Sequence, residues 1–387
     1  MEYKEYELGE LLYYEQPTPY IVESTDYNDA YETPVLTAGK SFILGYTDEK
    51  EGIYDQLPVI IFDDFTTASQ YVNFKFKVKS SAMKILTPVT ELVLPKYIYY
   101  RIQIIQFDHS THKRYWIQQY SKIRVSIPPI PEQERIVARI EELFSQLDAG
   151  VETLKKTKAQ LVVYRQAVLK EAFEGRLTAS DPEKIVRLGD YIETPRYGTS
   201  KKCSYDDGRD RTAVYRIPNI EHKNGRISHD DIKYAQFTES ELDGIRLQQG
   251  DILIIRSNGS VSLVGRAAMV CDADITGTFA GYLMRLRISE PETLLPKFLL
   301  LFLQSHQARI YIENKAKSTS GVHNINSTEI SDLQIPLYDP DTQYAIIEAI
   351  ESRLSVCDSI EHTVDTALQQ AEAMRQSILK DAFEGKL

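Results

Sequence analysis

Residues 169–177 read LKEAFEGRL, and residues 379–387 read LKDAFEGKL. These copies end a longer internal repeat: when the sequence is shifted by 210 positions, residues 133–177 align with residues 343–387, and 17 of the 45 pairs are identical. A repeat at a fixed period indicates one structural unit written more than once. The chain is therefore predicted to contain two equivalent halves, each a variable region followed by a common tail.

The common tail carries an apolar heptad pattern. Its seam recurs at multiples of seven residues, at Ile140, Leu147, Leu154, Leu161 and Val168 in the first copy and at Ile350, Val364, Ala371 and Ile378 in the second. A second apolar row runs through Ile136, Leu143 and Tyr164, and through Ile346, Ile360, Ala367 and Met374. Apolar residues sustained over several heptads are typical of a coiled coil. We therefore expect each tail to form a long helix and the two helices to pack on each other.

Such helices are long enough to act as a spacer, because a helix of about 40 residues rises about 60 Å. Two ordinary bundle helices would give the same pattern. Duplication of the seam favours a spacer that joins two equivalent heads. The expected fold class is therefore α+β, with two globular domains separated by a pair of long antiparallel coiled-coil helices in a pseudo-two-fold internal repeat.

The repeat also sets the expected domain boundaries. They are a first globular domain at 1–126, a central spacer helix at 127–177, a linker at 178–186, a second globular domain at 187–334 and a C-terminal spacer helix at 335–387. Apolar runs bounded by turn residues, such as 59–65 and 251–259, predict strands. The runs at 97–106 and 298–313 favour helices. Each globular domain is thus expected to mix short strands with a few helices.

The distribution of charge is uneven. The formal net charge of −11 argues against a simple nucleic-acid binder, because phosphate neutralisation needs a basic face. However, residues 1–73 hold 15 acids and 3 bases, whereas residues 74–126 hold 2 acids and 10 bases. Residues 187–334 hold 19 of each sign. Such asymmetry allows a basic surface on an acidic protein.

The sequence gives no sign of a membrane or secreted protein. No apolar run approaches the roughly 18 residues that span a bilayer, and the acidic start MEYKEYELGE lacks the pattern of a signal peptide. Cys203, Cys271 and Cys357 have no CxxC spacing, so neither a disulfide framework nor a zinc site is predicted. A cytoplasmic location is expected.

The first head offers a basic segment at 74–79, FKFKVK, in which apolar and basic residues alternate. A strand there would bury the apolar side chains and present Lys75, Lys77 and Lys79 on the opposite face, where they suit phosphates. A solvated edge strand protected by lysines explains the same pattern. The polar run that follows favours the phosphate-binding interpretation. The candidate DNA-binding residues of this head are Lys40, Ser41, Thr66, Thr67, Lys75, Lys77, Lys79 and Lys84.

The second head offers four polar loops. Arginine and lysine address guanine, asparagine addresses adenine, and serine or threonine addresses bases or phosphates, so these loops suit base readout. Polar loops also occur on any globular domain. The candidate DNA-binding residues are Thr199, Ser200, Lys201, Lys202, Arg216, Asn219, Arg256, Ser257, Asn258, Lys317, Ser318, Thr319, Ser320, His323 and Asn324.

Motifs of enzymes are missing. The chain has no GxGxxG, no GxxxxGK[ST], no [DN]PP[YF] methyltransferase signature and no HExxH. No set of nucleophile, base and orienting residue stands out. We therefore predict no catalytic residue and no metal ligand in this chain.

The sequence resembles the specificity subunits of Type I restriction–modification systems over essentially its whole length. The resemblance rests on IPPIPEQERIV at 127–137, the AFEGRL and AFEGKL endings, RIPNI at 216–220, GDIL at 250–253 and SGV at 320–322. It departs from the family pattern where the second helix begins YDPDTQ at 338–343 and where Arg353 replaces an apolar seam residue. The docking sites on the two helices are therefore not expected to be identical.

The resemblance implies two target-recognition domains, each reading one half of an interrupted double-stranded DNA site, with the paired helices setting the gap. It implies two modification subunits that dock on the helices, carry S-adenosylmethionine and methylate adenine, and restriction/translocase subunits that use ATP and Mg. This chain would itself bind no cofactor and catalyse nothing. A coiled-coil scaffold whose heads bind protein is the alternative, and an autonomous nuclease or methyltransferase is the enzyme alternative.

Overall fold

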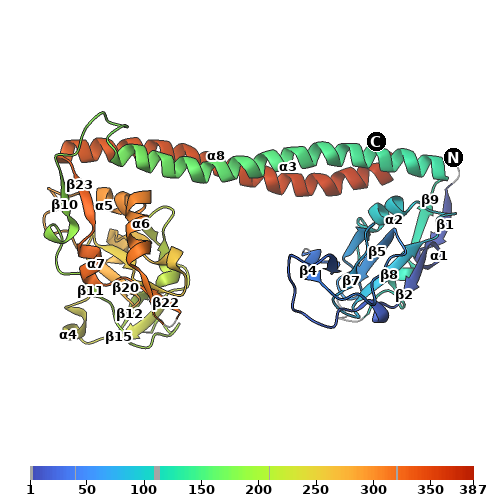
Figure 1. Ribbon diagram of the computed structural model, residues 1–387, viewed down its shortest axis with the longest axis horizontal. Helices are drawn as coiled ribbons and strands as arrows, with labels where there is room; N and C mark the ends of the chain where they lie inside the picture. Colours follow the sequence, from blue (N-terminus) through green and yellow to red (C-terminus); the bar gives the residue numbers. More distant parts are fainter. Residues whose placement is uncertain (1–2, 40, 109–113, 209, 320) are drawn as a thin grey trace. The chain divides into compact units, whose positions relative to one another are not determined.

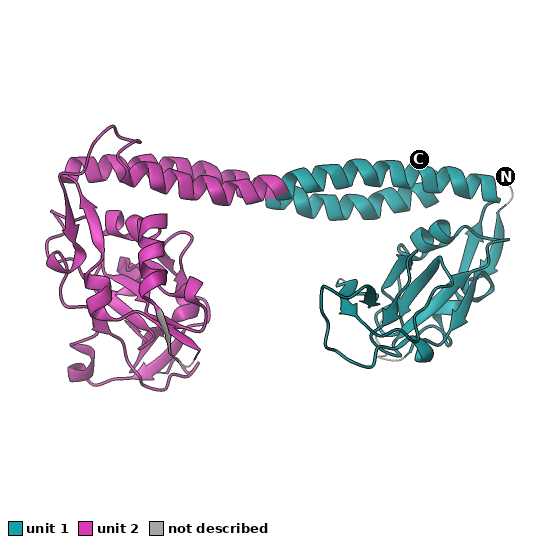
Figure 2. Ribbon diagram, in the orientation of Figure 1, with its two compact units in different colours: residues 1–155, 365–387 teal, residues 156–364 magenta. Residues whose placement is uncertain are grey.

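The computed structural model describes residues 3–39, 41–108, 114–208, 210–319 and 321–387, and the side chains of 317–319 are left out of the description. The chain divides into two compact units (Figures 1 and 2). Unit 1 comprises residues 1–155 and 365–387, and unit 2 comprises residues 156–364. Each unit holds one head and part of both long helices.

The two tails form helices α3 (Ile130–Phe173) and α8 (Pro340–Phe383), each of 44 residues. Their first and last residues are 210 positions apart, as the internal repeat predicts. In unit 1 Arg375 of α8 is ion-paired with Asp148 of α3, and in unit 2 Arg165 of α3 lies 2.6 Å from Asp358 of α8. As the residue number rises along α3, the residue number of its partner in α8 falls. The helices are therefore antiparallel, as predicted, and we call them the stem.

The predicted seam is partly covered and partly open. Buried seam residues are Ile140, Leu161, Val168, Ile350, Val364 and Ala371, whereas Leu147, Leu154 and Ile378 are half-buried. Cys357 fills the seam position between Ile350 and Val364 and is 1% exposed. The second row is wrong at Tyr164, Ile360 and Met374, which are exposed. A contact between only two helices buries one narrow stripe, since a strict seam is narrower than the apolar face of a globular helix.

Head 1 runs from β1 to β9 and contains three sheets. β1 (Lys4–Glu7) pairs with β9 (Arg124–Ile127), and a four-stranded sheet has the order β2 (Leu12–Glu15), β8 (Met83–Pro88), β5 (Val59–Asp63), β6 (Ser69–Val72). A three-stranded sheet has the order β4 (Ile43–Thr47), β3 (Thr33–Leu36), β7 (Lys77–Val78). The helices are α1 (Leu8–Leu11) and α2 (Pro95–Ile102).

Head 2 runs from β10 to β23 and repeats this plan. β10 (Lys184–Arg187) pairs with β23 (Gln334–Leu337). The larger sheet has the order β11 (Arg196–Tyr197), β20 (Leu283–Leu286), β16 (Ile252–Ile255), β18 (Ala267–Met269). The smaller sheet has the order β15 (Lys233–Gln236), β12 (Arg211–Tyr215), β19 (Thr278–Phe279). Head 2 adds β13 (Ile220–Glu221) with β14 (Arg226–Ile227), and β17 (Ser257–Asn258), β22 (Val322–Asn324) and β21 (Lys317–Thr319). Its helices are α4 (Glu239–Leu242), α5 (Pro296–Leu303), α6 (His306–Lys315) and α7 (Ser327–Ser331).

The two heads thus share one topology although their sequences differ. Strand β3 is antiparallel to β4 and parallel to β7, and β12 is likewise antiparallel to β15 and parallel to β19. In the same correspondence, β5 and β6 of head 1 match β16 and β18 of head 2. The connection at 64–68 in head 1 is therefore equivalent to the connection at 256–266 in head 2.

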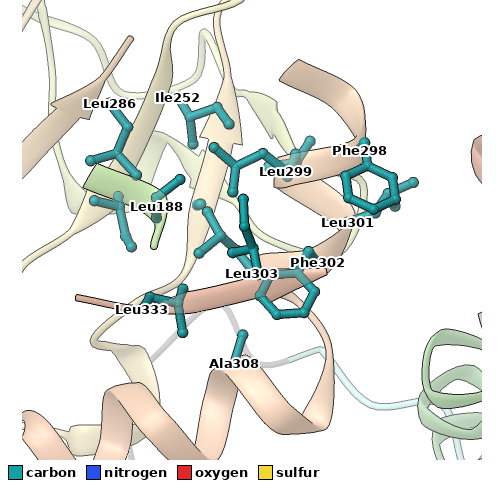
Figure 3. Close-up of a cluster of buried hydrophobic side chains, with 14 of the residues drawn as sticks. Leu188, Ile252, Leu286, Phe298, Leu299, Leu301, Phe302, Leu303, Ala308 and Leu333 are labelled. Carbon is teal, nitrogen blue, oxygen red and sulfur yellow. The ribbon is translucent and has the colours of Figure 1, made fainter. Parts of the chain in front are cut away.

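Helix α5 forms the centre of the core of head 2 (Figure 3). Phe298, Leu299 and Phe302 are fully buried between sheet residues such as Ile252 and the stem. The helix predicted over 298–313 is in fact two, because the chain turns at Ser305, whose Oγ accepts a hydrogen bond from the backbone N–H of Ala308 at 3.3 Å. Serine is favoured at such a helix start.

A buried glutamine joins each head to the stem. In unit 1, Gln133 of α3 accepts a hydrogen bond from the N–H of Leu94 at 2.8 Å and donates to the carbonyls of Leu92 (3.1 Å) and Pro128 (2.9 Å). Gln343, its copy in α8, makes the same three contacts in unit 2, with Leu295, Thr293 and Tyr338. Both glutamines are 0% exposed.

A ring contact and an ion pair also occur in both units at the junction between the head and the stem. The ring of Tyr97 on α2 lies 5.3 Å from that of Phe383, and the ring of Phe298 on α5 lies 5.3 Å from that of Phe173. Lys96 and Lys297, the second residues of α2 and α5, pair with Glu141 and Glu351 of the stem. Each head is therefore fixed to its own part of the stem by equivalent contacts.

Candidate nucleic-acid interface

Three segments of head 2 meet beyond the end of β16. The N–H of Arg256 donates to the carbonyl of Tyr282 at 2.9 Å, and the N–H of Ile325 donates to the carbonyl of Arg256 at 2.9 Å. Strand β17 pairs antiparallel with β22, so that Ser257 lies opposite Asn324 and Asn258 opposite His323. The structure therefore brings together Arg256, Ser257, Asn258, His323 and Asn324, which the sequence places in two separate loops.

A fourth segment completes this surface. The N–H of Thr199 donates to the carbonyl of Phe279 at 2.8 Å, and the N–H of Gly281 donates to that of Thr199 at 2.7 Å. Gly198 permits this approach, because a Cβ at that position would lie 2.2 Å from the Phe279 oxygen. We call the resulting surface the head-2 tip; it consists of Tyr197, Thr199, Arg256, Ser257, Asn258, Tyr282, His323 and Asn324.

Arg256 is held in place at this tip. Its guanidinium lies 4.3 Å from the centre of the Tyr197 ring, and its Nη1 donates to the carbonyl of Gly281 at 3.1 Å. Within the described part of the chain no carboxylate forms an ion pair with Arg256, and its buried Nε has no hydrogen-bond partner. An arginine that is held in position and has no carboxylate partner is suited to a guanine edge or a phosphate.

The sequence did not identify Tyr197 and Tyr282, which are 41% and 63% exposed. Each is adjacent in sequence to a glycine, Tyr197 to Gly198 and Tyr282 to Gly281. An exposed aromatic beside such a glycine is the signal that would have indicated them. Together with Arg256 they give the tip the aromatic and cationic surfaces on which unstacked bases and sugars pack.

Other candidates of head 2 lie elsewhere. Lys201 is ion-paired with Glu241 at 2.7 Å, and Arg216 with Asp231 at 2.9 Å, so both cations are already neutralised. Asn219 was predicted to bind DNA and this is wrong, because it is 0% exposed. Its amide donates to the carbonyls at 228 and 230 and holds the turn that follows β12.

The remaining candidates of head 2 are either open or not described. Ser200 and Lys202 are exposed beside the tip residue Thr199. The side chains of Lys317, Ser318 and Thr319 lie outside the description, as does residue Ser320 altogether.

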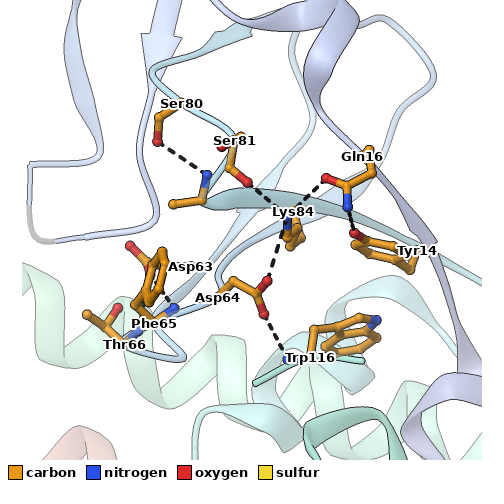
Figure 4. Close-up of polar contacts among 11 residues, drawn as sticks. Tyr14, Gln16, Asp63, Asp64, Phe65, Thr66, Ser80, Ser81, Lys84 and Trp116 are labelled. Carbon is orange, nitrogen blue, oxygen red and sulfur yellow. Dashed lines mark hydrogen bonds and ion pairs between the residues drawn. The ribbon is translucent and has the colours of Figure 1, made fainter. Parts of the chain in front are cut away.

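The equivalent place in head 1 contains a buried ion pair (Figure 4). Lys84 and Asp64 are 0% and 1% exposed, and Lys84 Nζ lies 3.6 Å from the carboxylate of Asp64. Lys84 also donates to Gln16 Oε1 at 3.0 Å and to the Ser81 carbonyl at 2.8 Å, while Asp64 accepts from the N–H of Trp116 at 2.8 Å. Burial lowers the pKa of Lys84, and Asp64 opposes that shift. The prediction that Lys84 contacts DNA is therefore wrong.

The predicted lysine face of head 1 is also wrong at one of its three positions. Only Lys77 and Val78 form strand β7, and Lys77 is 3% exposed because it pairs with Glu49 at 2.8 Å and donates to the carbonyl of Glu51 at 2.7 Å. Lys75 is exposed and lies 3.6 Å from Asp55, whereas Lys79 is exposed with no ion pair found among the described residues. The alternation of apolar and basic residues predicted a longer strand with its lysines on one open face, but β7 contains only Lys77 and Val78, and both are buried.

We call the connection at 64–68, equivalent to the connection at 256–266 of head 2, the head-1 tip, and its turn is exposed. Phe65 and Thr66 are exposed, and their N–H groups donate to Asp63 Oδ1 at 2.8 and 3.1 Å. Thr67 follows with a φ of 57°, a left-handed conformation that is costly for a β-branched residue. Arg114 is exposed and close enough to Lys84 to lower its pKa, and Lys79 is also exposed in this head. Ser41 is exposed too, whereas Lys40 lies outside the described residues.

Three cysteines are free: Cys203 is half-buried, Cys271 exposed and Cys357 buried. Among the side chains that the structure describes, no group of three or more histidines, cysteines or acids is placed to hold a metal ion. In the same residues no helix is long and apolar enough to cross a membrane.

The chain is similar in sequence to DNA specificity proteins. The family model of the Type I restriction modification DNA specificity domain matches residues 1–161. The specificity subunit of the Type I restriction enzyme EcoR124I/EcoR124II of Escherichia coli is 47% identical over 174 residues, which cover 42% of this chain and 43% of that protein. The EcoKI specificity subunit of Escherichia coli K12 is 29% identical over 277 residues, covering 69% and 58%. The chain thus spans about half the length of these relatives.

Solved structures share the fold. A structure from work on complex assembly and conformational transition of the type I R-M system has a TM-score of 0.72 at 16% identity, covering 100% of this chain and 98% of that one. The HsdS subunit from Thermoanaerobacter tengcongensis has a TM-score of 0.53 at 16% identity, covering 100% and 97%. The two heads, the antiparallel stem and the repeated junction thus occur in a chain that is similar in sequence, over part of its length, to Type I restriction enzyme specificity subunits and shares the fold of solved structures from such systems.

Proposed function

We propose that this chain is the sequence-specific DNA-binding subunit of a Type I restriction–modification complex. Its two heads, at 1–126 and 187–334 with a linker at 178–186, each read one half of a bipartite double-stranded site. The stem sets the gap between the halves. The chain itself catalyses nothing and directs adenine methylation and restriction by other subunits.

The observation that carries this proposal is the repeated head. One topology occurs twice, attached to the stem through equivalent residues such as Gln133 and Gln343, while the tips differ. A protein that must read two different half-sites needs equivalent supports with different reading surfaces. The scaffold alternative explains the stem but gives no reason for a polar, cationic and aromatic tip on head 2.

The head-2 tip supplies the groups that base readout needs. Arg256 offers donors to guanine, Asn258 and Asn324 offer paired donor and acceptor groups to adenine, and the exposed tyrosines supply packing surface. The head-1 tip is less basic, because Lys77 and Lys84 neutralise internal acids. We therefore expect head 2 to contribute more of the electrostatic part of DNA affinity.

The partners belong to the proposal as well. Two modification subunits would dock on the stem and bring S-adenosylmethionine, and restriction/translocase subunits would bring ATP and Mg. A cytoplasmic location follows from this role.

Methylation mapping by single-molecule sequencing tests the proposal. Cells carrying this chain with its cognate modification subunit are compared with cells carrying that subunit alone. A bipartite adenine-methylated motif that appears only with this chain supports the role and gives the target and gap together. No new motif despite a stable complex would refute DNA specificity and favour the scaffold. Methyl transfer by the purified chain alone would revive the enzyme alternative.

A further inference from the structure

Unit 2 contains a pocket that the proposed DNA-reading role does not use. It has a volume of about 410 Å³ and lies between the head and the stem of this unit. One wall is apolar, with Leu169 of α3, Leu303 of α5 and Leu354 of α8. A pocket of this volume is in the range of small-molecule sites.

The other wall is cationic. Arg266 donates from Nε to the Ser262 carbonyl at 3.0 Å and from Nη1 to His222 Nδ1 at 3.2 Å. Arg309 beside it donates to the Val264 carbonyl at 2.6 Å and pairs with Glu313 at 2.8 Å. No carboxylate of the described residues pairs with Arg266.

The positive potential of this wall is visible in its titrating groups. Burial lowers the pKa of His222, and Arg266 and Arg309 lower it further. Burial and Arg309 also lower the pKa of Arg266. Crowded like charges of this kind are relieved by a bound anion, because an opposite charge nearby favours the charged form.

Unit 1 carries a larger side chain at one of the positions that line this pocket. The repeat equates Leu354, which lines the pocket, with Phe144 of unit 1. In unit 1 the rings of Tyr100 and Phe144 lie 5.7 Å apart, and Arg375 stacks on Phe144 at 4.6 Å. In unit 1 a packed aromatic ring, that of Phe144, therefore occupies the position at which unit 2 has the shorter Leu354.

We propose that this pocket binds a phosphate monoester with a small apolar body, the phosphate on Arg266 and Arg309 and the apolar body against Leu169, Leu303 and Leu354. The same phosphate chemistry occurs in a free metabolite and in the backbone of DNA. The recess between head and stem favours the free ligand. The site does not depend on the proposed function, since none of its residues belongs to the head-2 tip.

Isothermal titration of the full chain tests the site with phenyl phosphate, inorganic phosphate and phenol as probes. Phenyl phosphate is expected to bind, inorganic phosphate more weakly, and phenol not at all at the same concentration. Arg266→Gln should weaken phenyl phosphate at least about tenfold, because a charge-assisted hydrogen bond to phosphate is lost. The matched control is Arg196→Gln on strand β11, an exposed arginine of the same unit that is not among the residues lining the pocket, and this variant should leave the affinity unchanged.

A second variant tests the apolar wall independently of the cations. Leu354→Phe introduces the residue that unit 1 carries at the equivalent position, and it should block phenyl phosphate by filling the pocket. A short DNA duplex of unrelated sequence separates the two sources: if it displaces phenyl phosphate and binds less tightly to Arg266→Gln, the occupant is backbone phosphate. Binding of phenyl phosphate without such competition assigns the free ligand. No binding of any phosphate probe, or equal effects of Arg266→Gln and Arg196→Gln, would overturn the site.

Discussion

Replacing Gln133 by leucine tests whether the buried glutamine fixes head 1 to the stem. The substitution keeps the volume but removes three hydrogen bonds, with the N–H of Leu94 and the carbonyls of Leu92 and Pro128. These groups then have no partner in a site where Gln133 is 0% exposed. A buried group without a partner costs about 1–3 kcal/mol, so three groups give about 3 kcal/mol at the lower limit.

Urea unfolding followed by tryptophan fluorescence measures this loss in unit 1 alone. The chain has one tryptophan, Trp116, which is 2% exposed in the core of head 1. With a slope of about 2 kcal/mol per molar urea, Gln133→Leu should lower the midpoint by about 1.5 M. Gln146→Ala, on the exposed face of α3, should change it by less than about 0.3 M, as surface substitutions do.

The copy in unit 2 provides the decisive comparison. Gln343→Leu makes the same chemical change but should leave the Trp116 transition nearly unchanged, because the lost contacts lie in unit 2. A midpoint for Gln133→Leu that matches Gln146→Ala, or equal shifts for Gln133→Leu and Gln343→Leu, would refute the reasoning.

Three other predictions concern DNA and the interior of head 1. Arg256→Gln should weaken binding of the target duplex by about 1–3 kcal/mol and relax preference at one base of one half-site, whereas Arg226→Gln should do neither; retained preference in a base-substitution series would remove Arg256 from the readout. Lys84→Met should lower the free energy of unfolding, followed by Trp116 fluorescence, by about 3–5 kcal/mol, because it leaves Asp64 buried and unpaired. Lys79→Ala should leave the free energy of unfolding unchanged and reduce the salt slope of DNA binding by about 1. A stable Lys84→Met variant with a reduced salt slope would contradict the burial of Lys84. Removing one matched heptad from both α3 and α8 should shorten the accepted gap without changing either half-site; methylation mapping that shows an unchanged gap would contradict the spacer role.

The repeat in the sequence was sufficient to predict the stem. The first residues of α3 and α8 are 210 positions apart, and so are their last residues. The ion pairs Asp148–Arg375 and Arg165–Asp358 are formed by residues that are identical in the two copies of the repeat. Heptad periodicity is a local property of the chain, so it is readable without knowledge of tertiary contacts. The exposed residues of the second row, Tyr164, Ile360 and Met374, show the limit, because periodicity does not reveal what covers a face.

The head-2 tip was predicted only in part. Arg256, Ser257, Asn258, His323 and Asn324 were identified as polar loop residues, but their meeting depends on the pairing of β17 with β22, more than sixty residues apart. Tyr197 and Tyr282 were missed, since exposed aromatics carry no periodic signal. Such long-range pairing is set by tertiary structure.

The sequence by itself determined the duplicated plan, the antiparallel stem and the absence of enzyme motifs, because these follow from repetition and periodicity along the chain. Only the tertiary structure decided which charges are available. Lys77, Lys84 and Asn219 look like DNA contacts in the sequence, yet each is buried with hydrogen-bond partners. The sequence does not distinguish a polar side chain that faces solvent from one that is paired with an internal acid. Whether the side chain is desolvated and paired depends on residues that are distant in the chain.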